Sequence, residues 1–147
     1  MQFNLDLNRH SYAIRAYGPG SVTVTLPLDS DDPAPAAVDA IGPAASRIRQ
    51  EVITQSLIIT PQHLIRDWPP QTLQELAEDH IRVLIELGVE VVLLGCGARL
   101  QWPDSQVLAP LMQARIGYEL MDTAAACRTY NILMSDGRRV AAALLMI

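Results

Sequence analysis

A chain of 147 residues suits one domain with a single hydrophobic core, and an aromatic fraction of only 5% makes that core mainly aliphatic. The formal net charge of −5 argues against a general nucleic-acid-binding protein, because such proteins need a cationic face. All eleven cations are arginine, and the absence of lysine excludes Schiff-base chemistry and a Walker-type phosphate site.

Membrane insertion, secretion and metal binding find no support in the sequence. No apolar run reaches the roughly 18 residues of a membrane-spanning helix, and the N-terminus lacks the pattern of a secretory signal. The two cysteines, Cys96 and Cys127, follow no metal-binding spacing and form no disulfide framework. We therefore expect a cytoplasmic protein without a metal or a cofactor.

The N-terminal part predicts a β-hairpin with strands over residues 11–16 and 22–26, joined by Gly18-Pro19-Gly20. Alternation along the second strand places Val22, Val24 and Leu26 on one face. Residues 27–45 are rich in proline, alanine and aspartate, which predicts a mobile loop within a single domain spanning residues 1–147.

The middle of the chain predicts two strands, over residues 47–53 and 56–60, and then a helix. Trp68 is expected either to close one end of the core or to line a pocket. A capping box from Thr72 to Glu75 opens the helix, and Gly88 ends it. Helical spacing predicts one apolar face made of Leu73, Leu76, His80, Val83, Leu84 and Leu87.

The C-terminal half predicts an α/β arrangement with parallel strands. Residues 89–94 form the most strand-like run, and a nearly continuous apolar run is typical of a central parallel strand. A helix capped by Asp104 or Ser105 is predicted to run to Ile116, and Pro110 makes it either start late or bend. A strand over residues 118–121 follows it. Asp122 then caps an alanine-rich helix, and a final strand over residues 138–147 is expected inside the sheet.

The topology predicts where a site would lie. A right-handed βαβ unit brings the loop Gly95-Cys96-Gly97 close to the Asp122 cap, at the sheet edge where open α/β sheets bind ligands. Backbone N–H groups of Thr123 and Ala124 would offer a weak anion site there. The candidate pocket comprises Gly95, Cys96, Gly97, Asp122, Thr123, Cys127, Arg128, Tyr130 and Asn131.

Each of these residues also has a structural interpretation. The bare GxG lacks the third glycine of a dinucleotide fingerprint, so it also fits a tight turn. Arg128 is either a partner for a carboxylate or phosphate, or a residue that forms a structural salt bridge or faces solvent. Asn131 either lines the pocket or bonds to neighbouring backbone. Tyr130 fits a core position with its hydroxyl at the rim, Cys127 is expected to be small and buried, and Cys96 is expected to be exposed.

Three segments resemble a family of small domains of unknown biochemical function, which includes the mitochondrial complex I assembly factor three and an adipogenesis-associated animal protein. They are the segment 94–97, the segment 121–133 and the segment 136–144, and the stretch from Ser56 to Pro61 followed by Trp68 is also similar. Cys96 departs from the small hydroxyl residue that this family often carries there. The resemblance implies a three-layer α/β fold with a mixed central sheet, an N-terminal hairpin and about three helices.

Three functions follow as alternatives. The resemblance implies a non-enzymatic protein-binding or assembly module, with respiratory complex subunits or assembly factors as partners. Such a module is expected to expose an apolar patch. The alternative is a small-molecule-binding protein or enzyme that uses the crevice between the Gly95–Gly97 loop and the helix from Asp122 to Leu133. A thiol–redox protein using Cys96 and Cys127 is the third, although no CxxC motif supports it.

Overall fold

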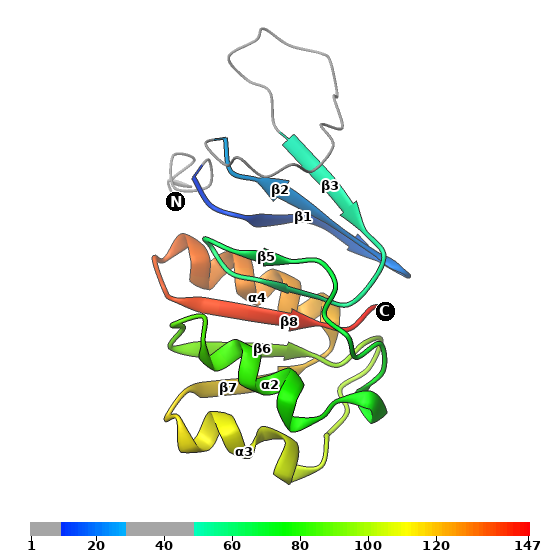
Figure 1. Cartoon of the computed structure of the whole chain (residues 1–147). Coiled ribbons are helices and arrows are strands. Elements are labelled where there is room, and N and C mark those ends of the chain that lie inside the picture. Colours follow the sequence, from blue (N-terminus) through cyan, green and yellow to red (C-terminus); the bar gives the residue numbers. More distant parts are fainter. Residues whose placement is uncertain (1–9, 29–48) are drawn as a thin grey trace, which may run out of the picture.

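The computed structural model describes residues 10–28 and 49–147, in which two β-sheets pack with three α-helices (Figure 1). Strand order and pairing confirm the α/β class with a mixed central sheet. The prediction of a single domain with a mobile loop over residues 27–45 stays a prediction, because residues 29–45 lie outside the described part. In the described residues, no helix has both the length and the apolar character that a membrane span requires.

The smaller sheet has three antiparallel strands: β1 (Ala13–Gly18), β2 (Ser21–Leu26) and β3 (Arg49–Ile53). The predicted hairpin is confirmed, and Gly20 in its turn has a φ of +74°, which favours glycine. All three of Val22, Val24 and Leu26 are buried on the inner face, as predicted. The first strand starts later than predicted, because the Tyr12 N–H donates to the Pro61 carbonyl instead of joining the ladder with β2.

The larger sheet has five strands: β4 (Leu57–Ile59), β5 (Leu64–Ile65), β6 (Val91–Gly95), β7 (Gly117–Met121) and β8 (Val140–Leu144). Their order is β5-β4-β8-β6-β7, with β6 parallel to both neighbours and β4 antiparallel to both of its own. The final strand is therefore internal, as predicted, and all of its residues are buried.

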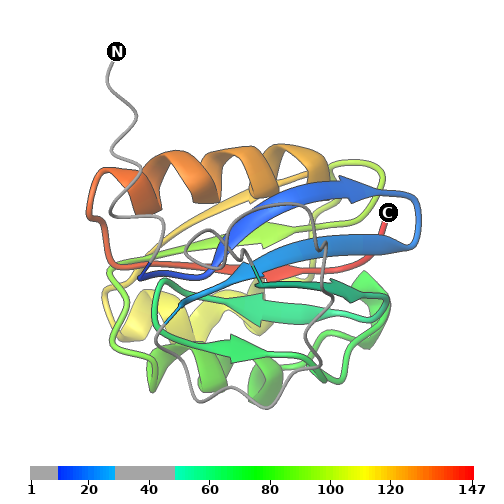
Figure 2. The same ribbon diagram turned by 90° about the horizontal axis from the view of Figure 1, so that it is seen from above.

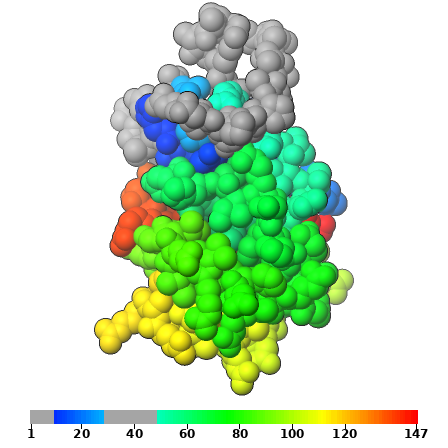
Figure 3. Space-filling model, viewed as in Figure 1, coloured from blue at the N-terminus to red at the C-terminus, as the bar shows by residue number. Residues whose placement is uncertain are grey.

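Helices cover both faces of the larger sheet. The 3-10 helix η2 (Leu73–Glu75), α2 (Glu78–Ile85) and α3 (Ser105–Gln113) lie on one face. Helix α4 (Thr123–Ser135) lies on the other, where it packs against β6 and β8 and also against β1 (Figure 2). The smaller sheet is thus docked on the larger one beside α4, and the segment from β4 to α2 forms much of the face shown in Figure 3.

Two cores result from the alternation of side chains along the strands. Leu57, Ile59, Leu93, Ala142 and Leu144 belong to the core under α4 and the smaller sheet. The residues between them in the same strands face the core under α2 and α3, and these residues are Ile58, Val92, Leu94, Ala141 and Ala143.

The helix predicted from residue 72 onwards is interrupted. The capping box at Glu75 exists, but it serves only η2, and the chain is extended at Leu76 and Ala77 before α2 begins. The restart shifts the helical register, so Ile81 and Leu84 are fully buried while Val83 is 38% exposed. The predicted position of Val83 on the buried face is therefore wrong.

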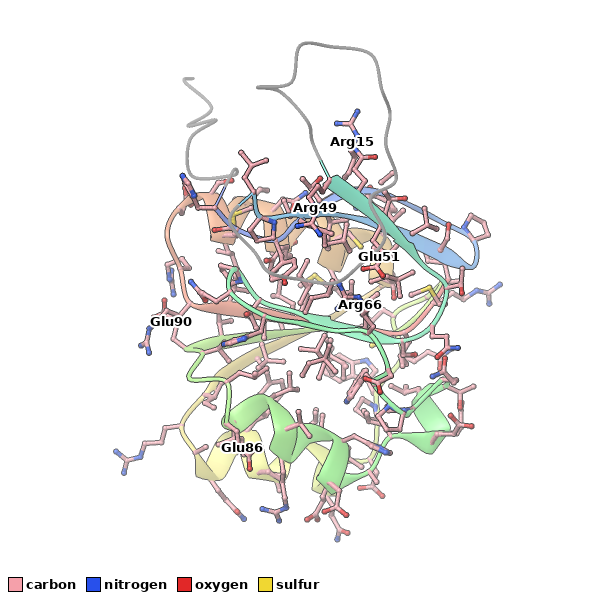
Figure 4. All side chains as sticks on the ribbon, turned by 45° about the horizontal axis from the view of Figure 1, so that its top comes forward. Arg15, Arg49, Glu51, Arg66, Glu86 and Glu90 are labelled. Carbon is pink, nitrogen blue, oxygen red and sulfur yellow. The ribbon has the colours of Figure 1, made fainter. Side chains whose placement is uncertain are left out.

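An ion pair joins β3 of the smaller sheet to Arg66, the residue that follows β5 of the larger sheet, on the side away from α4. Glu51 of β3 lies opposite the buried Val24 and therefore points inwards, where its Oε2 accepts from Arg66 Nε at 2.7 Å. Figure 4 shows both side chains between the sheets. Since both are only partly exposed, this pair orients the smaller sheet more firmly than a fully solvated pair would.

Candidate functional site

The predicted meeting of the Gly95–Gly97 loop with the start of α4 is present. The two segments are joined by hydrogen bonds in both directions: Gly97 N–H donates to Thr123 Oγ1 and Thr123 N–H donates to the Gly97 carbonyl, each at 2.9 Å. Cys96 N–H also donates to the Met121 carbonyl at 2.9 Å. The topology rule that predicted this proximity therefore holds.

Direct packing fills this junction. Thr123 is fully buried, and its hydroxyl donates to the Leu145 carbonyl at 2.6 Å while accepting from Gly97. A Cβ at Gly95 would lie 2.9 Å from Thr123 Oγ1 and 3.0 Å from Leu144 Cδ2. The glycine is thus required for close approach of β6 to α4.

The predicted anion site loses one of its two donors, the Thr123 N–H, to an internal partner, and the Asp122 carboxylate occupies a further N–H of the same turn. Thr123 N–H bonds to Gly97, and the Asp122 carboxylate accepts from Ala125 N–H at 2.9 Å. Asp122 therefore acts as the N-cap of α4, as predicted, and its carboxylate places a negative charge at the N-terminal end of this helix. That charge repels an anion.

The two thiols lie on opposite faces of the larger sheet. Cys127 is fully buried in the core under α4, and burial raises its pKa to about 12. Cys96 belongs to the core under α2 and α3, where its Sγ lies 3.2 Å from the Gln101 carbonyl, and burial raises its pKa too. The prediction that Cys96 is exposed is wrong, because the following loop folds back over the thiol and leaves it 5% exposed. Both thiols stay protonated at neutral pH, which disfavours nucleophilic or redox chemistry.

Two further predicted residues of α4, Tyr130 and Asn131, bond to backbone groups of the smaller sheet at the start of β1 and just before it. Tyr130 is fully buried, and its hydroxyl donates to the Tyr12 carbonyl at 2.7 Å, while burial raises its pKa well above the ordinary value. The Asn131 side chain makes two hydrogen bonds with the backbone of Ile14. The expectations that the Tyr130 hydroxyl lies at the rim and that Asn131 bonds to neighbouring backbone are therefore wrong. These contacts fix the smaller sheet in place.

Arg128 lies on the exposed side of the same contact. Its Nη1 donates to the Tyr17 hydroxyl at 2.8 Å, and the guanidinium carbon lies 5.9 Å from the centre of the Tyr17 ring. The structure therefore separates the nine predicted residues into three groups. Gly95, Cys96, Gly97, Asp122 and Thr123 form a closed junction at the sheet edge, Cys127 lies in the core, and Arg128, Tyr130 and Asn131 contact the smaller sheet.

The described residues show a different hollow, which sequence reasoning missed. A cavity of about 260 Å³ lies between η2 and the loop that enters α3. Its lining is mostly apolar and comprises Leu73, Gln74, Leu76, Trp102, Pro103, Asp104 and Val107. Trp102 is 75% exposed at this cavity, and Leu100 in the same loop is 49% exposed.

The signal for this surface was present in the sequence but incomplete. Trp102 is one of only two tryptophans, and it stands in a polar stretch just before Pro103 and the cap residue Asp104. No periodicity links it to Leu73 and Leu76, which precede it by more than twenty residues. In the described part of the chain, no group of three or more histidine, cysteine or acidic side chains is placed to hold a metal ion.

Curated relatives include proteins named as assembly factors of an NADH dehydrogenase subcomplex. The human NADH dehydrogenase (ubiquinone) 1 alpha subcomplex assembly factor 3 is 36% identical over 85 residues, which are 56% of this chain and 46% of that protein. The Rattus norvegicus protein of the same name is 28% identical over 120 residues, 80% of this chain and 64% of that protein. The match thus spans less than two thirds of these relatives. An uncharacterised Rhodobacter capsulatus protein is 35% identical over 74% of this chain and 82% of its own length.

Solved bacterial structures share the fold over nearly the whole chain. A Bordetella parapertussis crystal structure has a TM-score of 0.70 at 29% identity and covers 94% of this chain and 98% of its own. A Xanthomonas campestris solution structure has a TM-score of 0.68 at 33% identity, with 99% and 92% covered. The family model for proteins of unknown function DUF498/DUF598 matches residues 38–145. This chain belongs to the DUF498/DUF598 family.

Proposed function

We propose that this chain is a protein-binding module that assists the assembly of a respiratory complex, and that it binds its partner through the surface around Trp102. The observation that carries this proposal is a tryptophan that is 75% exposed beside an apolar cavity. Tryptophan is enriched at protein interfaces and dominates their binding energy when it becomes buried. An exposed apolar patch is the feature expected of an assembly module.

The relatives supply the partner class. The human and rat relatives are named as assembly factors for an NADH dehydrogenase, so subunits or assembly factors of such a complex are the proposed partners. Two free, buried cysteines suit a reducing compartment, and the proposal places the protein in the cytoplasm.

The alternative of a small-molecule site between the Gly95–Gly97 loop and α4 has weaker support. The contact atoms there are already hydrogen-bonded to one another, and Thr123 is fully buried. The cavity beside Trp102 does not favour a small-molecule ligand either, because its volume of about 260 Å³ is below the roughly 300–1,000 Å³ of typical small-molecule pockets.

The test is capture of the tagged chain from its own cells after mild crosslinking, followed by mass spectrometry. Trp102→Ser removes the exposed aromatic ring, and Met112→Ser serves as the control, because Met112 is 63% exposed at the far end of α3 and does not line the cavity. We expect respiratory-complex subunits or assembly factors with the wild type and with Met112→Ser. We expect their recovery to fall by about tenfold or more with Trp102→Ser.

Two results would contradict the proposal. If no capture contains respiratory-complex proteins, the proposed role in assembly is wrong. If Trp102→Ser and the wild type recover the same amount of these partner proteins, the surface around Trp102 is not the binding surface.

A further inference from the structure

The cavity beside Trp102 has the size and lining of a receptor for one side chain. Its volume of about 260 Å³ is below the usual range for a cofactor or drug-sized ligand. Leu73, Leu76 and Val107 give it apolar walls, with Trp102 and Pro103 on the loop side. A single large apolar side chain, aromatic or leucine-like, would gain most from burial there.

The surroundings of the cavity are acidic. Asp104 lines it, and its Oδ1 accepts from Gln106 N–H at 3.0 Å as the N-cap of α3. Glu75 lies in η2 between the lining residues Leu73 and Leu76, and its Oε2 accepts from the Gln71 N–H at 2.6 Å.

The next turn adds further negative charge. Glu78 and Asp79 begin α2, and Arg82 pairs with Glu78 at 3.2 Å. Arg99 is the cation of the loop that carries Trp102. The segments 73–82 and 99–107 together hold four carboxylates and two guanidinium groups, so the surface carries a net negative charge.

This charge discriminates between possible occupants. A second copy related by two-fold symmetry would bring an equally acidic surface to the cavity, and like charges across an interface are unfavourable. An anionic membrane surface would be repelled for the same reason. A segment with cations next to an apolar anchor matches both the charge and the cavity.

We propose that the cavity between η2 and the Trp102 loop binds one large apolar side chain on a positively charged segment of a partner protein. This inference rests on the proposed function and specifies the chemistry of the partner at that site. The apolar side chain supplies burial against Trp102, and the flanking cations face Asp104 and Glu75.

The test uses the indole N–H signals of the full chain in ¹⁵N-correlated NMR spectra. The chain has two tryptophans, and Trp68 is buried with its Nε1 donating to the His80 carbonyl at 3.2 Å, so only Trp102 reports on this surface. Trp102→Phe assigns its signal. The probes are short peptides with a central phenylalanine flanked by arginines, the same peptide flanked by glutamates, and the arginine peptide with serine at its centre.

We expect the arginine–phenylalanine peptide to shift the Trp102 signal and to leave the Trp68 signal unchanged. The glutamate and serine peptides are expected to bind about tenfold more weakly or not at all. Affinity for the arginine–phenylalanine peptide is expected to fall as salt is added, because the charges are exposed.

Variants of the protein locate the charge effect without loss of the helix caps. Glu75→Gln keeps the capping box and Asp104→Asn keeps the N-cap, since the amides preserve those hydrogen bonds. The double variant is expected to bind the arginine–phenylalanine peptide about fivefold more weakly. Glu86→Gln is the matched control. Glu86 is the exposed C-cap of α2, at the end of the helix away from η2 (Figure 4). The Glu86→Gln protein is expected to bind the arginine–phenylalanine peptide with the affinity of the wild type.

Each contrary result overturns the inference. If the glutamate peptide binds as tightly as the arginine–phenylalanine peptide, positive charge on the partner is not needed. If the serine peptide binds as tightly, the large apolar side chain is not needed. If the Trp102 indole signal shifts with protein concentration in the absence of peptide, a second copy of the chain occupies the cavity. If the signal shifts on addition of anionic lipid vesicles, a membrane surface occupies it. If the peptides fail while capture of respiratory-complex proteins still depends on Trp102, only this inference fails. If the peptides bind as expected but capture finds no such proteins, only the assembly role fails.

Discussion

The side-chain amide of Asn131 is paired with the backbone of Ile14. Asn131 Oδ1 accepts from the Ile14 N–H at 2.9 Å, and Nδ2 donates to the Ile14 carbonyl at 2.7 Å. Ile14 lies in β1, an edge strand of the smaller sheet, next to a bulge at Arg15. The amide thus occupies the position where a further strand would pair, which protects the edge and fixes the sheet to α4.

Asn131→Ala should therefore destabilise the protein. It removes two hydrogen bonds between elements that are distant in the sequence, and we expect the free energy of unfolding to fall by about 2 kcal/mol. Urea unfolding followed by circular dichroism measures this change. Ile132→Ala is the control, because Ile132 is the next residue of α4 and is 61% exposed, so its effect should stay within about 0.5 kcal/mol. Equal losses for the two variants would show that the amide pair contributes nothing specific.

The hydroxyl of Thr123 should contribute to stability by joining three segments. Thr123→Val keeps the shape but leaves the buried Gly97 N–H and Leu145 carbonyl without this partner, and we expect a loss of about 3 kcal/mol. Thr123→Ser keeps the hydroxyl and loses only a methyl group, so its loss should be about 1 kcal/mol. Thermal and urea unfolding of both variants give the comparison. A valine variant as stable as the serine variant would contradict the role of the hydroxyl.

Gly95→Ala should strain the contact between β6 and α4. The added Cβ would lie 2.9 Å from Thr123 Oγ1 and 3.1 Å from Thr123 Cα, and the backbone atom cannot swing away. Overpacking of this kind typically costs about 1–3 kcal/mol. Gly18→Ala provides the matched control, because a Cβ at Gly18 meets nothing within 4 Å. Its stability should stay within about 1 kcal/mol of the wild type. If both variants unfold at the same urea concentration, the close approach at Gly95 is not limiting.

The sequence predicted the parts of this molecule that follow from local rules. Asp122 was identified as an N-cap and the Gly95–Gly97 loop was placed beside it, because cap chemistry and the handedness of βαβ units do not depend on distant side chains. The central position of the last strand followed from its uninterrupted apolar run.

The partners of the α4 side chains could not be predicted in this way. Asn131 and Tyr130 bond to backbone groups more than a hundred positions earlier, at the start of β1 and just before it. A sequence pattern reports that these side chains are polar, but it does not report which distant backbone groups they satisfy. At the level of the sequence, the two side chains therefore fit a pocket as well as a structural contact.

Burial of Cys96 and exposure of Trp102 depend on a single irregular loop. The loop turns back so that the Gln101 carbonyl meets the Cys96 thiol, and the same turn leaves Trp102 facing solvent beside η2. Neither effect has a periodic signature, because loops lack the repeat on which sequence-based prediction of burial relies.

The buried thiol of Cys127 should make the protein less stable at alkaline pH. Its pKa is raised to about 12 in the folded chain, whereas an unfolded cysteine has a pKa near 8.5. Above about pH 8.5 the unfolded chain releases this proton and the folded chain keeps it, so the unfolded state binds fewer protons and stability falls as pH rises. Between pH 7 and pH 9.5 this thiol should lower the free energy of unfolding by about 1.4 kcal/mol.

Urea unfolding of the wild type and of Cys127→Ala from pH 7 to pH 9.5 measures this contribution. The alanine variant lacks the thiol, so its stability should decline less over this range by about 1.4 kcal/mol, on top of a constant offset for the smaller side chain. The window stops below pH 10, because the raised pKa of Tyr130 adds a loss of the same sign at higher pH. Parallel curves for the two proteins would mean that the Cys127 thiol titrates equally in both states and is not held neutral by the core.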